Sequence, residues 1–471
     1  MTYLNLIQNK VKEEKENIIE CLQQLIREKS VGADGLPDRP FGEGVDNAFK
    51  FMLSKGNLDG FETVNVDNMG GHIEYGHGRE ILGILAHLDV VPEGNGWNFG
   101  PYDGIIDNGK IYGRGAIDNK GPVVASYYAL KILKDLGIKP NKRIRIILGL
   151  DEETNWKGVK HYFENEEMPT IGFTPDSDFP VVNREMGILV FDLAKKFPKP
   201  FGKGISLRSV KGGNAPNMVP DSARAVVTAD KKEVYLDIKA KAASYRERGI
   251  KIKCKGIGKS LEITSTGVSA HGANPSAGIN AIGQLLGFLA EIEFNNEGIN
   301  EFIDFYNKHI GMETDGSSLG IAMEDQVSGK LILNVGMINL DPKSVELSVN
   351  VRYPVTLTDQ AVYREMEELL NKFNIGVVKY KHQLPVFVSE DEPLVKILMD
   401  VYKEHTGDEE ARPLAIGGGT YARACENVLA FGPCFPGEPE VEHQPDEYIE
   451  IKNLLKLVEI YADAIYRLAC A

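Results

Sequence analysis

The stretches ILGILAHLD (81–89) and RIRIILGLDEE (143–153) decide the fold of this 471-residue chain. The first begins as a continuous apolar run, which is typical of a strand buried on both faces. Both lead directly into acidic side chains. Between them, a Gly-, Asp- and Asn-rich loop (94–117) precedes a helical pattern that begins near Gly121-Pro122. This alternation of buried strand and helix predicts an α/β fold with a mainly parallel sheet covered by helices.

The pattern of apolar and polar residues changes after about residue 187. From 188 to 386, strand patterns such as SVELSVNVRY (344–353) alternate apolar and polar residues, as in antiparallel sheets with one covered face. We therefore expect one domain formed by residues 1–187 and 387–471, and an inserted α+β domain at 188–386. The insert is large enough for two similar subdomains.

Other segments carry helix or strand patterns of their own. Apolar residues at helical spacing predict helices at 3–29, 45–55, 157–165, 231–248, 278–292, 359–374 and 448–469. Strands are predicted at 61–66, 71–75 and 427–433, and a short strand within 169–178 leads into another acidic loop.

Composition limits the classes of partner. The formal net charge is −15 and the hydrophobic content 42%, which fits a soluble globular protein that repels nucleic acid and anionic membranes. The five cysteines are widely spaced without a CxxC motif, as expected for free thiols in a reducing compartment. The charged start of the chain lacks a signal-peptide pattern, and no run of ~18 apolar residues is present. We therefore expect a cytoplasmic protein without membrane contact.

Five side chains of metal-binding type are spread along the chain, most of them just past a strand-like run. They are His87, Asp118, Glu153, Asp176 and His443. In open α/β sheets, ligands bind beyond the carboxyl ends of the strands. Two histidines and three carboxylates without cysteine favour Zn²⁺, although Mn²⁺ or Co²⁺ would also fit.

Two further carboxylates accompany this set. Asp89 can accept the second ring N–H of His87 and so fix its tautomer. Adjacent residues leave a strand end in different directions, so Glu153 can bind metal while Glu152 faces the water as general base.

Each signal alone has an ordinary structural alternative. Asp118 could be a helix N-cap, and the 152–153 pair a solvated acidic turn. His443 could be a surface loop residue. The repeated placement of acidic residues after strands is what favours one shared site.

The motifs HLDVVP (87–92), GRGAIDNKGP (113–122), DEET (151–154) and HQPDEY (443–448) together resemble the co-catalytic zinc aminoacylase/carnosinase metallopeptidases. The resemblance covers the whole chain in order. It implies that one zinc ion is bound by His87 and Asp176, the other by Glu153 and His443, and that Asp118 bridges both. It also implies a cis peptide bond between Asp118 and Asn119, with Glu152 as general base and Asp89 behind His87.

The inserted domain carries two lid motifs of the same family. NAPNMVPDSARA (214–225) points to Asn217, and STGVSAHGANP (265–275) points to His271, which is expected to stabilise the oxyanion of the tetrahedral intermediate. Arg352 matches a lid arginine that holds the substrate carboxylate. Without the resemblance, the sequence around His271 is typical of a surface turn, and Arg352 would be a surface charge on a strand.

The glycine-rich segment IGGGT (416–420) lacks the lysine of a phosphate-binding loop, so a nucleotide site is weakly supported. The resemblance makes it a backbone cradle for substrate. Its residues are Gly417, Gly418, Gly419 and Thr420.

The long insert resembles that of the PepV-type dipeptidases, whose doubled lid supplies the histidine and arginine within one chain. A monomer is therefore expected. The function implied is hydrolysis of dipeptides with a free amino terminus by two zinc ions per chain. The alternatives are an N-acyl amino acid deacylase and, from another class, a non-catalytic peptide-binding protein.

Overall fold

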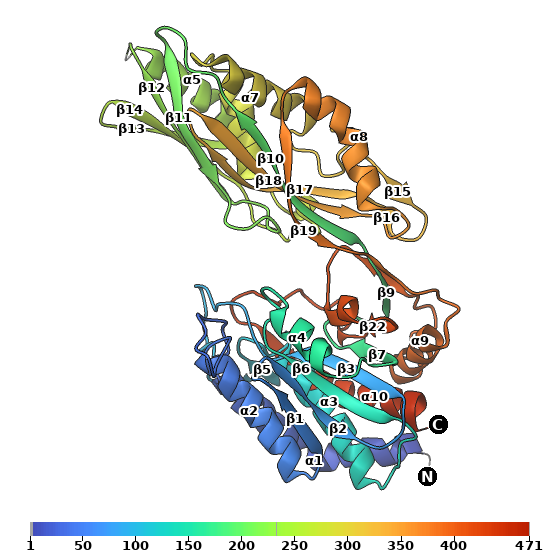
Figure 1. Ribbon diagram of the computed structural model, residues 1–471. Helices are drawn as coiled ribbons and strands as arrows, with labels where there is room; N and C mark the ends of the chain where they lie inside the picture. Colours follow the sequence, from blue (N-terminus) through green and yellow to red (C-terminus); the bar gives the residue numbers. More distant parts are fainter. Residues whose placement is uncertain (1–2, 232, 471) are drawn as a thin grey trace. The chain divides into compact units, whose positions relative to one another are not determined.

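The computed structural model describes residues 3–231 and 233–470 (Figure 1). The chain divides into two compact units. The first comprises the chain up to Asn183, Phe387–Leu414 and the part from Thr420 onward. The second comprises Arg184–Val386 and Ala415–Gly419.

The sheet of the first unit is built around parallel strands. Six strands of this nine-stranded sheet follow in the order β1-β2-β6-β3-β7-β22, in which β6, β3, β7 and β22 are parallel and β1 and β2 are antiparallel additions at one side. Beyond β22 the sheet continues with β9 (Val182–Glu185), which is antiparallel to β22. The strands are β1 (Glu62–Val66), β2 (Gly70–Tyr75), β3 (Ile81–His87), β6 (Arg143–Gly149), β7 (Ile171–Thr174) and β22 (Val428–Ala430). The predicted mainly parallel, helix-covered α/β sheet is confirmed.

Both faces of this sheet are covered. In β3, Ile84 belongs to the large hydrophobic cluster formed with the helices, whereas Leu85 belongs to a smaller cluster on the opposite face. This explains why the strand reads as a continuous apolar run. The helices of the unit are α1 (Tyr3–Arg27), α2 (Glu43–Leu58), α3 (Lys120–Asp135), α4 (Lys157–Asn165), α9 (Pro393–Thr406) and α10 (Ile451–Ala469).

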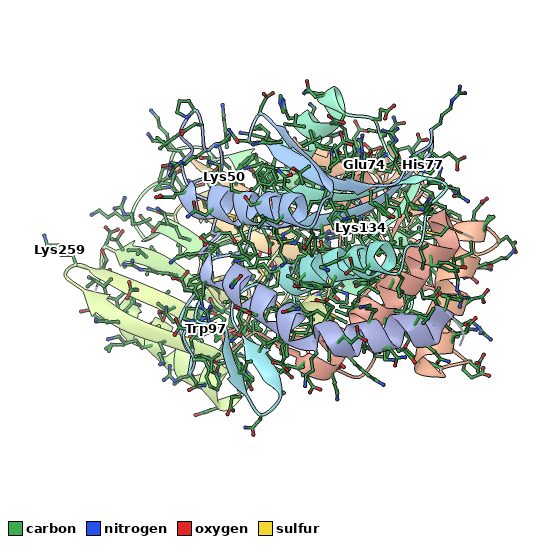
Figure 2. All side chains as sticks on the ribbon, turned by 90° about the horizontal axis from the view of Figure 1, so that it is seen from below. Lys50, Glu74, His77, Trp97, Lys134 and Lys259 are labelled. Atoms are coloured by element: carbon green, nitrogen blue, oxygen red, sulfur yellow. The ribbon has the colours of Figure 1, made fainter. Side chains whose placement is uncertain are left out.

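Four of these helices pack together. α10 packs against α3, α1 and α9. Side chains at the rim also join elements: Lys134 on α3, labelled in Figure 2, donates to the carbonyl oxygen of Asp59 and lies 4.8 Å from the ring centre of Phe61. α3 is followed by Gly137 at φ 73°, a left-handed conformation that commonly ends a helix and that glycine adopts without steric cost.

Short strands outside the main sheet shape its loops. They are β4 (Ile105–Asp107), β5 (Lys110–Tyr112), β8 (Ser177–Asp178), β23 (Pro433–Cys434) and β24 (Tyr448–Glu450). β24 pairs with β5, so the segment that carries His443 is tied to the loop before Asp118. Three further strands lie where the chain passes from one unit to the other: β9 (Val182–Glu185), β20 (Val386–Phe387) and β21 (Leu414–Ile416).

The second unit contains one antiparallel sheet in the order β13-β14-β12-β11-β17-β18-β10-β19. The strands are β10 (Gly187–Lys196), β11 (Ile205–Gly212), β12 (Ser222–Ala229), β13 (Lys251–Ile257), β14 (Ser260–Thr266), β17 (Ile332–Leu340), β18 (Ser344–Tyr353) and β19 (Gly376–Gln383), with the small hairpin β15 (Glu324–Asp325) and β16 (Gly329–Lys330). Lys259 lies at the tip of the β13–β14 hairpin (Figure 2). The insert, for which two subdomains are expected from the sequence, forms one eight-stranded sheet and one hydrophobic cluster.

The helices of the second unit are α5 (Val234–Glu247), α6 (Ala281–Leu289), α7 (Glu297–His309) and α8 (Asp359–Lys372), with a short 3-10 turn at Pro275–Ala277. The helix predicted at 231–248 corresponds to α5, and residue 232 lies outside the described part. Helix α7 was not predicted from the sequence, although Asn296 caps it by accepting a hydrogen bond from the amide of Ile299. Within the described residues, no helix combines the length and the apolar character needed to cross a membrane.

Candidate active site

The predicted ligand side chains of the first unit meet at the carboxyl ends of its parallel strands. His87 is the last residue of β3, Glu153 follows β6, and Asp176 follows β7. Parallel strands end at one edge of the sheet, so these side chains are brought together. Asp118 lies just before α3, and His443 lies in the loop before β24.

Asp118 is at the centre of the cluster. Its Oδ1 atom lies 3.0 Å from Nε2 of His87, and its Oδ2 atom lies 2.9 Å from Nε2 of His443. The same His443 nitrogen is 2.9 Å from Oε1 of Glu153, and the His87 nitrogen is 3.4 Å from Oδ1 of Asp176. Each oxygen of Asp118 therefore faces a different histidine.

The backbone of Asp89 orients the His87 ring. It is 1% exposed, and its Nδ1 atom lies 2.9 Å from the backbone oxygen of Asp89. A carbonyl oxygen can only accept, so Nδ1 carries a proton, and Nε2 is directed at the carboxylates of Asp118 and Asp176, which favour a proton or another cation at this nitrogen. The Asp89 carboxylate is 3.5 Å from the same Nδ1, so the backbone of Asp89 makes the closer contact.

The carboxylate of Asp89 has a second task. Its two oxygens accept hydrogen bonds of 3.1 Å from the backbone amides of Glu152 and Glu153. Asp89 thus links the end of β3 to the loop after β6. The carboxylate of Asp151 accepts from the amides of Lys157 and Gly158 and holds the start of α4.

The electrostatics of the cluster are those of crowded, buried carboxylates. Burial, followed by neighbouring acids, raises the pKa of Glu152, Glu153 and Asp176. Burial alone would lower the pKa of His443, but Asp118 and Glu153 raise it to about 11. The groups compete for positive charge, which suits a site for divalent cations.

Fit to a metal is supported by donor geometry as well as charge. Two groups of three residues have donor atoms that all lie within 4.8 Å of one another. One group is His87, Asp118 and Glu153, and the other is His87, Glu152 and Asp176. Imidazole nitrogens and carboxylate oxygens are the donors of zinc sites and related transition-metal sites. The residues present therefore fit metal ions.

Two buried residues that were not predicted as site residues hold acidic members of the cluster in place, Glu447 at Asp118 and Asn119 at Asp176. Glu447 is fully buried; its Oε1 accepts from the amides of Ile117 and Asp118, and its Oε2 lies 2.6 Å from Nη1 of Arg114. Asn119 donates from Nδ2 to the Pro175 carbonyl oxygen and to Oδ1 of Asp176.

The peptide bond between Asp118 and Asn119 is cis, as the family resemblance implies. The sequence signals for Glu447, its partner Arg114 and Asn119 are the motifs in which they lie. Arg114 and Asn119 lie in GRGAIDNKGP, and Glu447 lies in HQPDEY.

Tyr421 is another residue that the sequence reading missed. Its ring meets the His87 ring edge to face, with centroids 6.3 Å apart, and it contacts the Trp156 ring at 5.1 Å. A Cβ atom at Gly149, the last residue of β6, would lie 2.3 Å from the tyrosine ring. The absence of a side chain at Gly149 therefore leaves the space that Tyr421 fills behind the cluster.

The predicted substrate-binding residues of the second unit converge on one part of its sheet. Asn217 accepts a 2.7 Å hydrogen bond through its backbone oxygen from the amide of Gly272, and Met218 forms an isolated β-bridge with His271. The segments that carry Asn217 and His271 are thus paired. Arg352 lies on β18 and is 4% exposed.

The glycine-rich segment divides between the units. Gly417, Gly418 and Gly419 group with the second unit, whereas Thr420 belongs to the first. A Cβ atom at Gly417 would lie 3.0 Å from the Cβ atom of Ala273, close to the His271 turn. Thr420 caps a short 3-10 turn, Tyr421–Ala424, by accepting from the amide of Ala422.

Comparisons with known proteins agree with this arrangement. The family model described as "Peptidase family M20/M25/M40" matches residues 83–467. A Bacillus subtilis protein named "Putative dipeptidase YtjP" is 43% identical over 97% of this chain and 98% of its own length. A Staphylococcus haemolyticus protein named "Putative dipeptidase SH1171" is 37% identical, over 98% of each chain.

Solved structures share the fold at low identity. Human carnosine dipeptidase 1 aligns with a TM-score of 0.58 and 14% identity, covering 98% of each chain. The dipeptidase Dug1p from Saccharomyces cerevisiae aligns with a TM-score of 0.56 and 13% identity, again over 98% of each chain. At these identities the likeness concerns the fold.

Proposed function

The chain belongs to peptidase family M20/M25/M40 and is a metallopeptidase, and we propose that it hydrolyses the peptide bond of dipeptides with a free amino terminus. The observation that carries the proposal is Asp118, whose two oxygens each face a different histidine in a cluster of buried carboxylates. The full-length relatives named as dipeptidases support the substrate class.

The residues that would hold two zinc ions are those of the cluster. His87 and Asp176 would hold one ion, Glu153 and His443 the other, and Asp118 both. When bound, such ions acidify a water molecule and polarise a carbonyl group. Mn²⁺ or Co²⁺ would suit the same nitrogen and oxygen donors.

Glu152 is the residue proposed to move the proton. Its backbone amide is held by Asp89, and its carboxylate belongs to the acidic group with His87 and Asp176. Burial and the neighbouring acids raise its pKa, which makes its carboxylate a better proton acceptor. It would take a proton from the attacking water on a carboxylate oxygen and deliver it to the leaving amine.

The second unit would bind and orient the substrate. The imidazole of His271 would donate to the oxyanion that develops at the scissile carbonyl. Asn217, Arg352 and the backbone of Gly417, Gly418 and Gly419 with Thr420 would hold the terminal carboxylate of the dipeptide. Because one chain supplies both groups of residues, we propose a monomer, acting in the cytoplasm.

The test is hydrolysis by metal-reconstituted protein with bound metal quantified. We expect cleavage of a small panel of dipeptides, abolished by a chelator and restored by Zn²⁺ or Mn²⁺, with two ions bound per chain. Faster hydrolysis of N-acetyl or N-succinyl amino acids than of dipeptides would assign a deacylase instead. No hydrolysis of either class by the metal-loaded protein would contradict a catalytic role.

A further inference from the structure

The sheet of the second unit contains a buried polar group next to Arg352. Asn334 on β17 and Asn350 on β18 are 2% and 1% exposed, and they lie directly opposite each other in the antiparallel register. Arg352 is two residues beyond Asn350, so all three side chains lie on the same face of the sheet. Polar side chains are costly to bury unless their hydrogen bonds are made, so their contacts indicate their task.

Asn334 holds the segment that carries Asn217. Its Nδ2 atom donates two hydrogen bonds of 2.9 Å, one to the backbone oxygen of Pro216 and one to that of Met218. These carbonyls flank Asn217. The segment also lies directly on β17, because a Cβ atom at Gly336 would be only 2.3 Å from the Pro216 oxygen.

The same segment reaches His271. The β-bridge between Met218 and His271 and the bond from the Gly272 amide to the Asn217 oxygen couple the two turns. Asn334 therefore holds a segment that is paired, through Asn217 and Met218, with the turn that carries His271.

Asn350 holds Arg352. Its Oδ1 atom accepts a 2.9 Å hydrogen bond from Nε of the guanidinium group. This bond fixes the plane of the guanidinium, on which two-point binding of a carboxylate depends. An amide orients the arginine without cancelling its charge, whereas an aspartate at this position would compete with a substrate carboxylate.

We propose that Asn334 and Asn350 are positioning residues, which set Asn217 with His271 and Arg352, respectively, in the geometry that binds a dipeptide. The inference rests on the proposed function. It separates two effects: Asn350 acts only through the arginine that holds the carboxylate, whereas Asn334 also acts through the histidine at the scissile carbonyl.

The experiment compares variants on a dipeptide and on the same dipeptide with a C-terminal amide. Asn350→Leu removes the acceptor for Arg352, and Asn350→Asp keeps the acceptor and the shape but adds a competing charge. Asn334→Asp keeps the shape and removes both donors. The matched control is Asn296→Asp: Asn296 is 1% exposed in the same unit and donates from Nδ2 to the Pro198 oxygen at 2.9 Å.

For both Asn350 variants we expect KM for the free dipeptide to rise about tenfold, the size of one charge-assisted hydrogen bond, with kcat nearly unchanged. The amidated dipeptide should change less than twofold, because it has no carboxylate for Arg352 to hold. Asn334→Asp should lower kcat about tenfold on both substrates. Asn296→Asp should lower the melting temperature without a selective change in KM or kcat.

The outcomes distinguish this inference from the proposed function. If the wild-type protein hydrolyses dipeptides but the Asn334 and Asn350 variants behave like Asn296→Asp, the positioning roles are wrong and the function stands. If the Asn350 variants lose equal activity on both substrates, the link to the carboxylate is wrong. A wild-type protein inactive on every dipeptide would overturn both proposals.

Discussion

The metal cluster of the first unit and the amide group of the second are held together by different interactions. In the first, the carboxylates of Asp118, Glu153 and Asp176 crowd around histidine nitrogens, and burial raises the pKa of Glu153 and Asp176. In the second, neutral amides of Asn334 and Asn350 bond to backbone oxygens and to Arg352. The first group calls for added positive charge, whereas the second is organised by the chain itself. Removing metal should therefore affect the two groups very differently.

The largest expected effect concerns the shared ligand. Asp118→Asn should abolish activity and the binding of both ions, because its two oxygens serve both histidines. Asp176→Asn should leave one ion bound, because only His87 lies near that carboxylate among the two histidines. Metal analysis of the purified variants measures the number of metal ions bound per chain. The exposed Asp34→Asn is the control, and equal metal content in the two cluster variants would contradict a bridging Asp118.

The next effect separates chemistry from metal binding. Glu152→Gln should keep its metal and lower kcat by about 10²–10⁴, the usual contribution of a general base. KM should change little, because the second unit is proposed to hold the substrate carboxylate. Steady-state kinetics with metal analysis check this, with the exposed Glu164→Gln as control. A variant with near-normal kcat would rule out Glu152 as the base.

A smaller effect is expected on the other side of the comparison. Arg352→Gln should raise KM for a free dipeptide about 10²-fold, since a charge-assisted pair contributes ~1.5–3 kcal/mol. Its metal content should equal that of the wild type. Kinetics on the free and amidated dipeptides measure the effect, and loss of metal in this variant would show that the two groups are not independent.

The two regions also differ in how far the sequence predicts them. The strands before His87 and Glu153 are marked by apolar runs, so their ends and the cluster between them follow from local patterns. The contact between Glu447 and Asp118 cannot be predicted from a local pattern, because the two residues are 329 positions apart in the chain. The roles of Asn334 and Asn350 cannot be predicted from the sequence either, because an asparagine in a strand pattern looks like an ordinary polar position. Only the strand register places the two residues opposite each other.

The smallest expected effect tests whether the frameworks of the two regions respond differently to acid. In the first unit, His72 on β2 is 1% exposed and accepts a 2.8 Å hydrogen bond at Nδ1 from the Tyr162 hydroxyl. Burial, followed by the charge of Arg145, lowers its pKa from 6.5 to about 3. The buried amides of Asn334 and Asn350 do not titrate.

The sign of the effect follows from proton binding. Below pH 6.5 the unfolded chain binds a proton at His72 that the folded protein excludes, so stability present above that pH is lost progressively towards about pH 3. His72→Gln should remove this loss. Between about pH 7.5 and about pH 5, its free energy of unfolding should fall by about 2 kcal/mol less than that of the wild type. Urea unfolding at both pH values measures the difference, with the exposed His77→Gln as control (Figure 2). Because Tyr162 and His72 tie α4 to β2, hydrogen exchange in those elements should report the change while β17 and β18 stay protected. Equal acid sensitivity in wild type and His72→Gln would mean that other groups set the acid response of the first unit.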